Sequence, residues 1–466
     1  MKNEYTSLTQ NQKLVWIGQE LNPESPMYNM AMTYEIKDVI SFSYFKLAFQ
    51  KLVEKSDALR SVFELKNGQP IQKYLTTIDY EIEFIDFSNK SNPKQDYAIW
   101  EKQRVQNQFD LKKCLFDCVL IQLSENHFIW YINQHHLITD GWSTAIVFSI
   151  MSELYAKALQ NNIFEAEEFP SYKSFVGYEH KIKENEKRKE ISNYWQEKLK
   201  TFPLTPALYH KKNILLQTAS KRLHLNLGKE RTKKIQALAN KKGIRGWSLD
   251  LTLYNIFLTA LFAFSYRVTG QKHLLIGSPT HNRISKKFKN TIGFFVEVFP
   301  LQTTITEKET FMSLLKKVQI ESNSFLKNAQ VGASTSDLNR NFNVFFNYIN
   351  ASNNNFNGVA VKTNLVHPEH TDPRHHLRLH VHDFDNSGEI QLYFDLNTKV
   401  FNNEERTLVP QHFLSLLDNF IADENERINA ASIITEIEIH KIAAWNNTSV
   451  QYPENETLLT KFELQV

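Results

Sequence analysis

Residues 132 to 143 read INQHHLITDGWS, and this stretch connects two patterns of regular structure. The segment that leads into it, residues 127 to 134 (HFIWYINQ), is dominated by aromatic and β-branched side chains, which is typical of a strand. The segment that follows, residues 142 to 159, repeats apolar side chains at helical spacing, with Ser143 available as the N-cap. The stretch therefore lies between a strand and a helix.

The two adjacent histidines of this stretch have more than one interpretation. Successive side chains of a strand point to opposite faces, so at most one of His135 and His136 enters a common cavity. A neutral imidazole is the usual general base near pH 7, and an Asp-Gly turn after a strand presents backbone N–H groups that stabilise an oxyanion. Packing of both rings in the core is the alternative. A zinc site is disfavoured, because no cysteine accompanies the pair and neighbouring strand residues diverge.

Length and charge limit the function classes. The chain has 466 residues, which exceeds the usual size of one hydrophobic core and predicts two domains or lobes. Its 54 basic and 51 acidic residues give a net charge of +3 and are scattered along the chain, which disfavours a nucleic-acid partner.

Two further features bear on the compartment. The N-terminus lacks the apolar run of a signal peptide, and the most apolar window, residues 249 to 266, is interrupted by polar side chains, so we expect a buried helix and no membrane span. The only two cysteines, Cys114 and Cys118, are expected to be free thiols in a reducing cytoplasm.

The chain alternates helix-like and strand-like segments twice. A mixed-charge segment at 181 to 200 is expected to be a solvated helix that bridges the two halves, and the Asn-rich stretch at 350 to 358 is expected to be a loop. We therefore predict an α/β fold with a first lobe over residues 1–178, a second lobe with the bridging helix over residues 179–445, and a linker-like segment over residues 446–466.

The stretch HHLITDGWS matches the HHxxxDG motif of the condensation domains of nonribosomal peptide synthetases, which are relatives of chloramphenicol acetyltransferase. Further segments resemble the family's other motifs in the expected order, so the resemblance covers essentially the whole chain. They are LTQNQKLVWIGQELNPESPMYN from Leu8, SDALRSVFE at 56 to 64, FPSYKSFVGYE at 169 to 179, TIGFFVEVFPL at 291 to 301 and NRNFNVFFNY at 339 to 348.

The resemblance implies a fold and a reaction. The expected fold is a V-shaped pseudodimer of two chloramphenicol acetyltransferase-like lobes with a central tunnel. Family members join a donor acyl thioester to the amine of an acceptor aminoacyl thioester, and both are delivered on phosphopantetheine arms of carrier proteins. The domain itself is expected to bind no cofactor and no metal. The resemblance implies that His136 accepts a proton from the amine or orients it.

The resemblance also assigns roles to other residues. The family pattern pairs Asp140 with an arginine of the second lobe, for which Arg283 is the candidate, so Asp140 is expected to hold the turn. Gly141 is expected to leave room for the pantetheine arm. The remaining residues expected to line the tunnel are Trp142, Ser143, Asn347 and Tyr348, although helix capping by Ser143 and an ordinary strand end at 347 to 348 are alternatives.

Departures from the family pattern are equally specific. Ser56 and Asp57 stand where His-Glu is usual, Glu297 stands where Asn is typical, and no QDxPFE motif precedes Arg340. The motifs of heterocyclising and epimerising relatives are absent, so plain condensation is favoured. The histidine-rich segment at 367 to 385 places His380 and His382 on one strand face with Arg378, where metal binding is an alternative to solvated or tunnel-lining imidazoles.

The subtype rests on the ends of the sequence. The first motif begins at Leu8, which favours a starter domain that takes an acyl group from acyl-CoA or an acyl carrier protein. Residues 458 to 466 resemble the start of an adenylation domain, so we expect one to follow in the same chain. The expected domain is monomeric and cytoplasmic. The alternatives are an internal domain with a peptidyl donor, a stand-alone acyltransferase with a soluble acceptor, and a non-catalytic recruitment domain.

Overall fold

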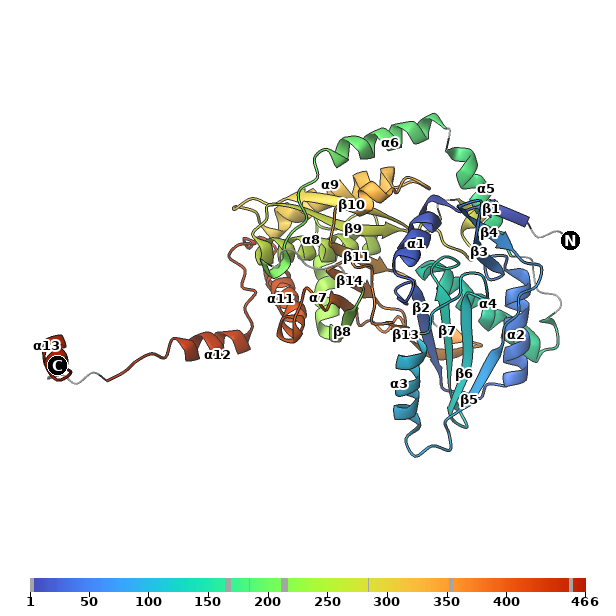
Figure 1. Ribbon diagram of the computed structural model, residues 1–466, viewed down its shortest axis with the longest axis horizontal. Helices are drawn as coiled ribbons and strands as arrows, with labels where there is room; N and C mark the ends of the chain where they lie inside the picture. Colours follow the sequence, from blue (N-terminus) through green and yellow to red (C-terminus); the bar gives the residue numbers. More distant parts are fainter. Residues whose placement is uncertain are drawn as a thin grey trace.

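The structure is a computed structural model that describes residues 4–163, 169–183, 185–210, 217–283, 285–351, 355–451 and 456–466. Two lobes lie side by side, and each is built on a six-stranded sheet (Figure 1). Each lobe has its own large cluster of buried apolar side chains. The α/β fold with two lobes that the alternation predicted is thus present.

The sheet of the first lobe is covered on both faces, which explains its nearly continuous apolar strands. Trp130 and Ile132 enter the core with helices α2 (Phe42–Lys55) and α4 (Gly141–Leu159), whereas Ile129 and Tyr131 pack on the other face near α3 (Pro93–Arg104). All strand pairs are antiparallel except β5 with β6. The order is β12 (Asn355–Phe356), β13 (Val359–Val366), β2 (Asn29–Ile36), β7 (His127–His135), β6 (Phe116–Ser124) and β5 (Ile82–Asp86).

A small sheet and one helix complete the N-terminal lobe. Helix α1 (Gln10–Leu21) begins at a capping box formed by Thr9 and Gln12, as the sequence TSLTQNQ allows. The small sheet has the order β1 (Glu4–Ser7), β4 (Gln69–Tyr74) and β3 (Ser61–Lys66). Cys118 lies in β6 and Cys114 precedes it, and both are free thiols.

The sheet of the second lobe is covered by helices on one face. Its order is β10 (Glu297–Thr304), β9 (His273–Thr280), β11 (Val344–Ile349), β14 (Leu377–His382), β15 (Gln391–Asn397) and β8 (Ser220–Asn226). The helices of this lobe are α7 (Gly228–Ala239), α8 (Leu249–Thr269), α9 (Phe311–Asn328), α10 (Ser336–Asn339) and α11 (Asn403–Ala422), with the short 3₁₀ turns Leu208–His210 and Lys286–Phe288.

Helix α8 is long and apolar enough to cross a membrane, and it is the one such helix among the described residues. However, 72% of its most apolar window is buried inside the lobe, where Phe257, Leu261 and Phe264 are fully enclosed. The expectation of a buried core helix is confirmed.

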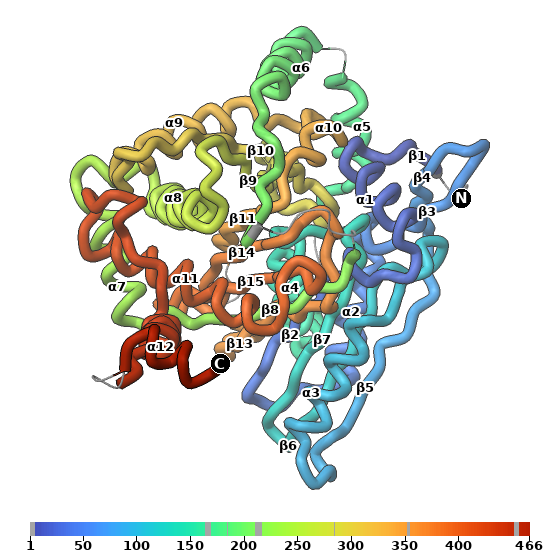
Figure 2. Tube along the Cα trace, turned by 60° about the vertical axis from the view of Figure 1, so that its left-hand side comes forward, coloured from blue at the N-terminus to red at the C-terminus, as the bar shows by residue number. Residues whose placement is uncertain are grey.

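One segment of the second half of the chain belongs to the first sheet. Strand β13 pairs with β2 over the register Val361↔Ile36 to Val366↔Ala31, and β12 continues that edge. Figures 1 and 2 both show β13 beside β2, although the strands before and after β12 and β13 in sequence, β11 and β14, belong to the second sheet. The predicted boundary at 178/179 therefore does not divide the lobes cleanly. The loop expected at 350 to 358 includes strand β12, while residues 352–354 lie outside the described residues.

Most of the mixed-charge segment forms one helix, α6 (Glu186–Leu199), which starts with Asn185 as its N-cap. Its first two residues, 181 and 182, are the end of the preceding helix α5 (Tyr172–Ile182). Figure 1 shows α6 crossing above the two lobes, as expected of a bridge. One side of it is not solvated, because Ile191 and Trp195 are buried in the second lobe's core.

The C-terminal segment extends away from the two lobes (Figure 1). Helices α12 (Glu436–Trp445) and α13 (Leu458–Glu463) contain no buried residue. Residues 452–455 of the expected linker lie outside the described residues.

Candidate active site

The turn after β7 is organised by Asp140. Strand β7 ends at His135 and α4 begins at Gly141, so Asp140 is the N-cap, and its Oδ1 accepts a hydrogen bond from the Ser143 backbone N–H at 2.8 Å. The prediction that Ser143 caps this helix is wrong. The aspartate directly before the first helical residue is the side chain that reaches the free N–H groups.

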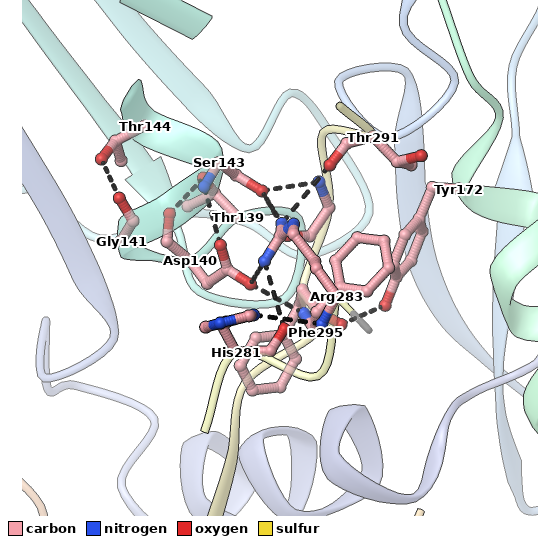
Figure 3. A network of polar contacts seen from close by, with 12 residues as sticks. Thr139, Asp140, Gly141, Ser143, Thr144, Tyr172, His281, Arg283, Thr291 and Phe295 are labelled. Atoms are coloured by element: carbon pink, nitrogen blue, oxygen red, sulfur yellow. Dashed lines mark hydrogen bonds and ion pairs between the residues drawn. The ribbon is translucent and has the colours of Figure 1, made fainter. Parts of the chain in front are cut away.

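Asp140 also joins the two lobes. Its Oδ2 accepts from Arg283 Nη1 at 2.9 Å and from the Phe295 backbone N–H at 2.9 Å, and both charged side chains are almost completely buried (Figure 3). Burial opposes ionisation of Asp140, but the Arg283 charge and these hydrogen bonds outweigh it and hold the pKa of Asp140 below its ordinary value. The expected partner of Asp140 is thus at hydrogen-bond distance, and both groups are charged.

Ser143 belongs to the same network and not to an open surface. Its Oγ donates to the Gly293 carbonyl at 2.7 Å and accepts from the Gly293 N–H at 3.0 Å and from Arg283 Nη2 at 2.6 Å (Figure 3). Its side chain is fully buried. Ser143 therefore does not line a tunnel, because residues of the other lobe use all of its polar capacity.

Two further residues support this network: Tyr172, to which the sequence assigned no role, and Asp57, which the sequence marked only as a departure from the family pattern. Tyr172 at the start of α5 donates to the Phe294 carbonyl at 2.7 Å, and a Cβ on Gly293 would overlap its ring. Asp57 holds the start of α5, since its carboxylate accepts from the backbone N–H groups of Tyr172 and Lys173 at 2.9 and 3.0 Å. Where the family pattern has the carboxylate of a glutamate, this chain has that of Asp57, and its role is structural. The resemblance of residues 56 to 64 to the family motif was the only sign in the sequence that this carboxylate has a role.

His135 is a fully satisfied core residue. Its Nδ1 accepts from the Leu137 N–H at 3.2 Å, which leaves Nε2–H to donate to Gln19 Oε1 at 3.2 Å. Burial, reinforced by repulsion from His136, lowers its pKa to about 3. Neither nitrogen of His135 is free for a substrate, so the packing interpretation holds for this histidine.

His136 differs from its neighbour in one respect that matters for chemistry. Its backbone N–H donates to the Tyr28 carbonyl at 2.9 Å, and its Nδ1–H donates to the Thr139 carbonyl at 2.9 Å. The second bond fixes the neutral tautomer with a lone pair on Nε2, and no described residue donates to that atom. The ring is only half-buried and lies edge-on to Phe294 at 5.0 Å.

The electrostatic surroundings keep His136 neutral. Burial is the largest cause that lowers the pKa of His136 below its ordinary value, and repulsion from Arg378 acts in the same direction. Asp140 and the Thr139 carbonyl oppose this shift without cancelling it. A neutral imidazole with a free Nε2 is the protonation state that a general base needs.

Gly141 and Trp142 lie beside His136 at the start of α4. A Cβ on Gly141 would meet no atom within 4 Å, so the space in front of it is open. Trp142 stacks on His281 of the second lobe, with ring centroids 5.1 Å apart. The glycine is thus compatible with the expected passage of an arm, and Trp142 contacts the opposite lobe.

Asn347 and Tyr348 lie near the end of strand β11 (Val344–Ile349) and point to opposite sides of the sheet. Asn347 Nδ2 lies 3.3 Å from His380 Nδ1 on the face without helices, whereas Tyr348 packs on the core beneath α8. The expectation that both line a tunnel is therefore wrong for Tyr348, because neighbouring side chains of a strand alternate.

The histidine-rich strand forms an ion network. His380 Nε2 lies 3.2 Å from Asp395 Oδ2, and Arg222 binds the same carboxylate through two hydrogen bonds of 2.6 and 2.9 Å. Across the described part of the chain, no group of three or more His, Cys, Asp or Glu has the arrangement of a metal site.

Glu297, which stands where the family pattern has asparagine, is a buried carboxyl group between the lobes. It accepts from the backbone N–H groups of Gly332 and Ser334, the latter at 2.8 Å. Burial, reinforced by the nearby Glu179, raises the pKa of Glu297 to about 8.

Comparisons with known proteins agree with this geometry. The sequence profile of the family described as "Condensation domain" matches residues 2–443. Gramicidin S synthase 2 of Brevibacillus brevis is 22% identical over 99% of this chain and 10% of its own length, and surfactin synthase subunit 1 of Bacillus subtilis (strain 168) is 24% identical over 100% of this chain and 13% of its own. The chain thus spans only a small part of these relatives.

Solved structures share the fold. The first condensation domain of the calcium-dependent antibiotic synthetase superposes with a TM-score of 0.82 at 18% identity, covering 93% of this chain and 99% of that one. A variant of the starter condensation domain of rhizomide synthetase in complex with C8-CoA gives 0.80 at 20% identity, covering 92% and 97%. The expected two-lobed α/β fold is confirmed, and with the profile match over nearly its whole length the chain belongs to the condensation domain family of nonribosomal peptide synthetases.

Proposed function

We propose that this chain joins a donor acyl thioester to the amine of an aminoacyl thioester held on a carrier protein. The observation that carries the proposal is the bonding of His136. Its Nδ1–H is held by the Thr139 carbonyl at 2.9 Å, and its Nε2 remains without a partner among the described residues. The phosphopantetheine arms of the partners supply the thioester and present the amine, and the open space in front of Gly141 fits such an arm.

The role proposed for His136 concerns one proton of the attacking amine. The amine nitrogen attacks the thioester carbonyl, so a C–N bond forms and the C–S bond breaks. His136 Nε2 accepts the proton that the amine loses or holds the amine by a hydrogen bond, and the departing thiolate takes up a proton. The fixed tautomer places the accepting lone pair on Nε2 when the amine arrives.

Asp140 and Arg283 have a positioning role in this proposal. Their ion pair is buried and each carboxylate oxygen is already bonded, so Asp140 has no free oxygen within the described structure to take a proton from a substrate. The pair holds the turn and α4 against the second lobe, which sets the place of the His136 ring.

The donor that we propose is an acyl starter. The rhizomide synthetase domain with which this chain shares its fold is a starter domain, and its structure is a complex with C8-CoA. That likeness supports a medium-chain acyl group as the first donor to try with this chain.

The test is a reconstituted condensation. The full chain is incubated with octanoyl-CoA or an octanoyl carrier protein and with a panel of aminoacyl carrier proteins, and the acceptor carrier is analysed by intact-mass spectrometry. A mass increase of one octanoyl group that depends on His136 supports the proposal. Product with free amines and not with carrier-bound ones would instead identify a stand-alone acyltransferase. Turnover only with peptidyl donors would identify an internal domain, and no product with any pair would indicate a recruitment domain.

A further inference from the structure

The face of the second sheet that lacks helices is polar and aromatic. On each strand of this sheet alternate residues face the helical core, such as Leu377, Leu379 and Val381 of β14. The residues between them point away from the helices. On the four neighbouring strands β11, β14, β15 and β8 these residues form what we call the polar face. Its members are Phe345, Asn347, Arg378, His380, His382, Tyr393, Asp395, Arg222 and His224.

The polar face is turned toward the first lobe. Arg222 Nη1 donates to the Leu365 carbonyl of β13 at 2.8 Å, and the Tyr393 hydroxyl lies 3.5 Å from Asn364 Oδ1 of the same strand. Because β13 is paired with β2, these contacts set the polar face against the sheet that carries His136. Figure 2 shows β14 and β15 next to β13 and β2.

Most charges on and beside this face are already paired. Asp395 is bound by two nitrogens of Arg222 and lies 3.2 Å from His380. Asp372, in the loop before β14, is bound by Arg374 Nη2 at 2.7 Å and Nε at 3.1 Å. Each of the two carboxylates therefore has its own guanidinium partner.

Arg378 is the arginine of this group that has no carboxylate of its own. It forms no ion pair and no hydrogen bond within the described part of the chain, and its Nε is buried without a partner. Its guanidinium lies 4.9 Å from the centre of the Phe345 ring, which holds the side chain in place. Asp395 and Asp372 are the carboxylates that act on its charge, and both are occupied by other arginines.

The histidines around Arg378 do not compensate for this charge. Burial, the largest cause, lowers the pKa of His375 to about 3 and that of His380 to about 4, so both are neutral near pH 7. The group of Arg222, Arg374, Arg378, Asp372 and Asp395 thus holds three positive and two negative charges in an enclosed setting. A buried guanidinium remains protonated, so one positive charge is left without a counter-ion.

Arg378 is close to the reacting centre. Its charge acts on His136 and on Tyr28, whose carbonyl binds the His136 backbone N–H. The side chain is only half-buried, like that of His136, so part of it is accessible to water. We therefore expect a group held at Arg378 to belong to a molecule that also reaches His136.

We propose that Arg378 binds a carboxylate carried by one of the two condensing groups, so that this chain prefers a dicarboxylic acyl donor or an acidic aminoacyl acceptor. The inference rests on the condensation reaction proposed above. A carboxylate accepts two parallel N–H bonds from a guanidinium and supplies the missing negative charge, whereas an amide of the same shape supplies no charge.

The experiment compares each acid with its own amide. Glutamyl and glutaminyl carrier proteins are used as acceptors with octanoyl-CoA, and succinyl-CoA and its monoamide are used as donors with the glutaminyl carrier. In the wild-type chain we expect one of the two pairs to show a higher kcat/KM for the acid, and the pair that does so identifies the source of the carboxylate. Arg378→Gln should reduce that acid-to-amide ratio by about 100-fold, and Arg378→Lys should reduce it less.

A matched control is available outside this group. Arg231→Gln removes the same charge from an arginine that is paired with Asp418 and leaves Asp372 and Asp395 bound as before, so we expect it to leave the acid-to-amide ratio unchanged. Equal turnover of acid and amide in both pairs, or an equal loss of ratio in both variants, would overturn the proposal.

Two measurements test the proposed role of Arg378 independently of the condensation reaction. If the wild-type chain forms no amide with any pair, the proposed function fails, and calorimetric titration with succinyl-pantetheine and its monoamide then tests Arg378 by itself. Tighter binding of the acid that Arg378→Gln removes supports the proposal, and equal binding refutes it. Thermal melting gives a second readout, because loss of an unpaired buried charge should not lower Tm. A fall of Tm in Arg378→Met as large as in Arg283→Met would make Arg378 a structural residue.

Discussion

Two arginines of the second lobe come close to the turn after β7, and their bonding is opposite. Arg283 binds Asp140, Ser143 and carbonyl groups of its own lobe, and it is almost completely buried. Arg378 stacks on Phe345 and has no described polar partner. The Nε of each arginine is buried without a partner, so the difference lies in the charge. A paired charge such as that of Arg283 holds a structure together, while an enclosed charge without a counter-ion costs stability and is retained where it binds something else.

The two adjacent histidines show the same difference on a smaller scale. Both ring nitrogens of His135 have hydrogen-bond partners within the lobe, whereas His136 has one bonded nitrogen and one open nitrogen. The comparison separates residues that support the site from residues that act in it. Variants at each of these positions test whether this division is correct.

The largest effect is expected at His136. His136→Ala removes the open nitrogen, and we expect amide formation to fall by between about 100-fold and 10,000-fold, the usual range for loss of a general base. The Tm should change little, because the ring is half-buried and makes one side-chain hydrogen bond. Carrier-protein mass spectrometry measures the first and thermal melting the second. Product formation at the wild-type rate would remove His136 from the mechanism.

The next effect is on stability at the Asp140–Arg283 pair. Asp140→Ala leaves Arg283 buried without its partner, and we expect a loss of about 3 to 5 kcal/mol in the free energy of unfolding. Chemical denaturation measures it. The control is the double variant Asp140→Leu with Arg283→Met, in which no charge is left unpaired and most of the stability should return. A single variant as stable as the wild type would contradict the supporting role.

A smaller stability loss is expected at His135. His135→Phe keeps the ring shape but leaves the Leu137 N–H and the Gln19 side-chain oxygen unpaired, which should cost about 1 to 3 kcal/mol. Activity per folded molecule should stay within a few-fold of the wild type. If this variant instead lost activity as His136→Ala does while keeping its Tm, the division between the two histidines would be wrong.

The pH profile of the reaction gives a finer measurement. The pKa of His136 is lowered below its ordinary value, so the neutral base persists through pH 7 and the rate should fall only on the acid side of pH 6.5. Arg378→Gln removes a repulsion that lowers the pKa of His136, so the acid limb should move to higher pH. Asp140→Asn removes an attraction, so its limb should move to lower pH. Shifts in the same direction would contradict the assigned electrostatics.

A pH-dependent effect on stability is expected at Glu297, a buried acid whose charge changes with pH in a way that the charge of an arginine does not. Its folded-state pKa of about 8 is above the ordinary value of 4.5, so its contribution to stability is present below pH 4.5 and is lost as pH rises toward 8. The raised pKa of Glu179 acts in the same direction. We expect Tm to fall between about pH 5 and pH 8 and to fall less steeply in Glu297→Gln. An unchanged slope would exclude Glu297 as its source.

The local part of the site was predictable from the sequence. The strand, the turn and the helix around His136 follow from side-chain periodicity, and strand alternation already limited the pair to one reactive histidine. The resemblance supplied the partner of Asp140, and the structure places Arg283 at hydrogen-bond distance. The same alternation would have placed Asn347 and Tyr348 on opposite faces, had it been applied there.

The remainder depends on contacts between distant segments. Ser143 was expected to cap its own helix, but its partner is Gly293, 150 residues away, and no local pattern encodes that contact. The pairing of β13 with β2 joins residues more than 300 positions apart, and the Asn-rich segment before it is typical of a loop. The sequence placed Arg378 on the same face as His380 and His382, but its lack of a partner is visible only when Asp372 and Asp395 are seen bound to other arginines.

The crossing of β13 into the first sheet has a consequence for how the chain folds during its synthesis. Strands β2, β5, β6 and β7 of the six-stranded sheet all lie before residue 136. Strand β13 is complete only when residue 366 has left the ribosome, so until then the edge of β2 has no neighbouring strand. An unpaired edge of this kind pairs readily with other chains. The N-terminal lobe therefore completes its sheet only after most of the second lobe has been made, and cutting the chain between the lobes would produce a fragment prone to aggregation.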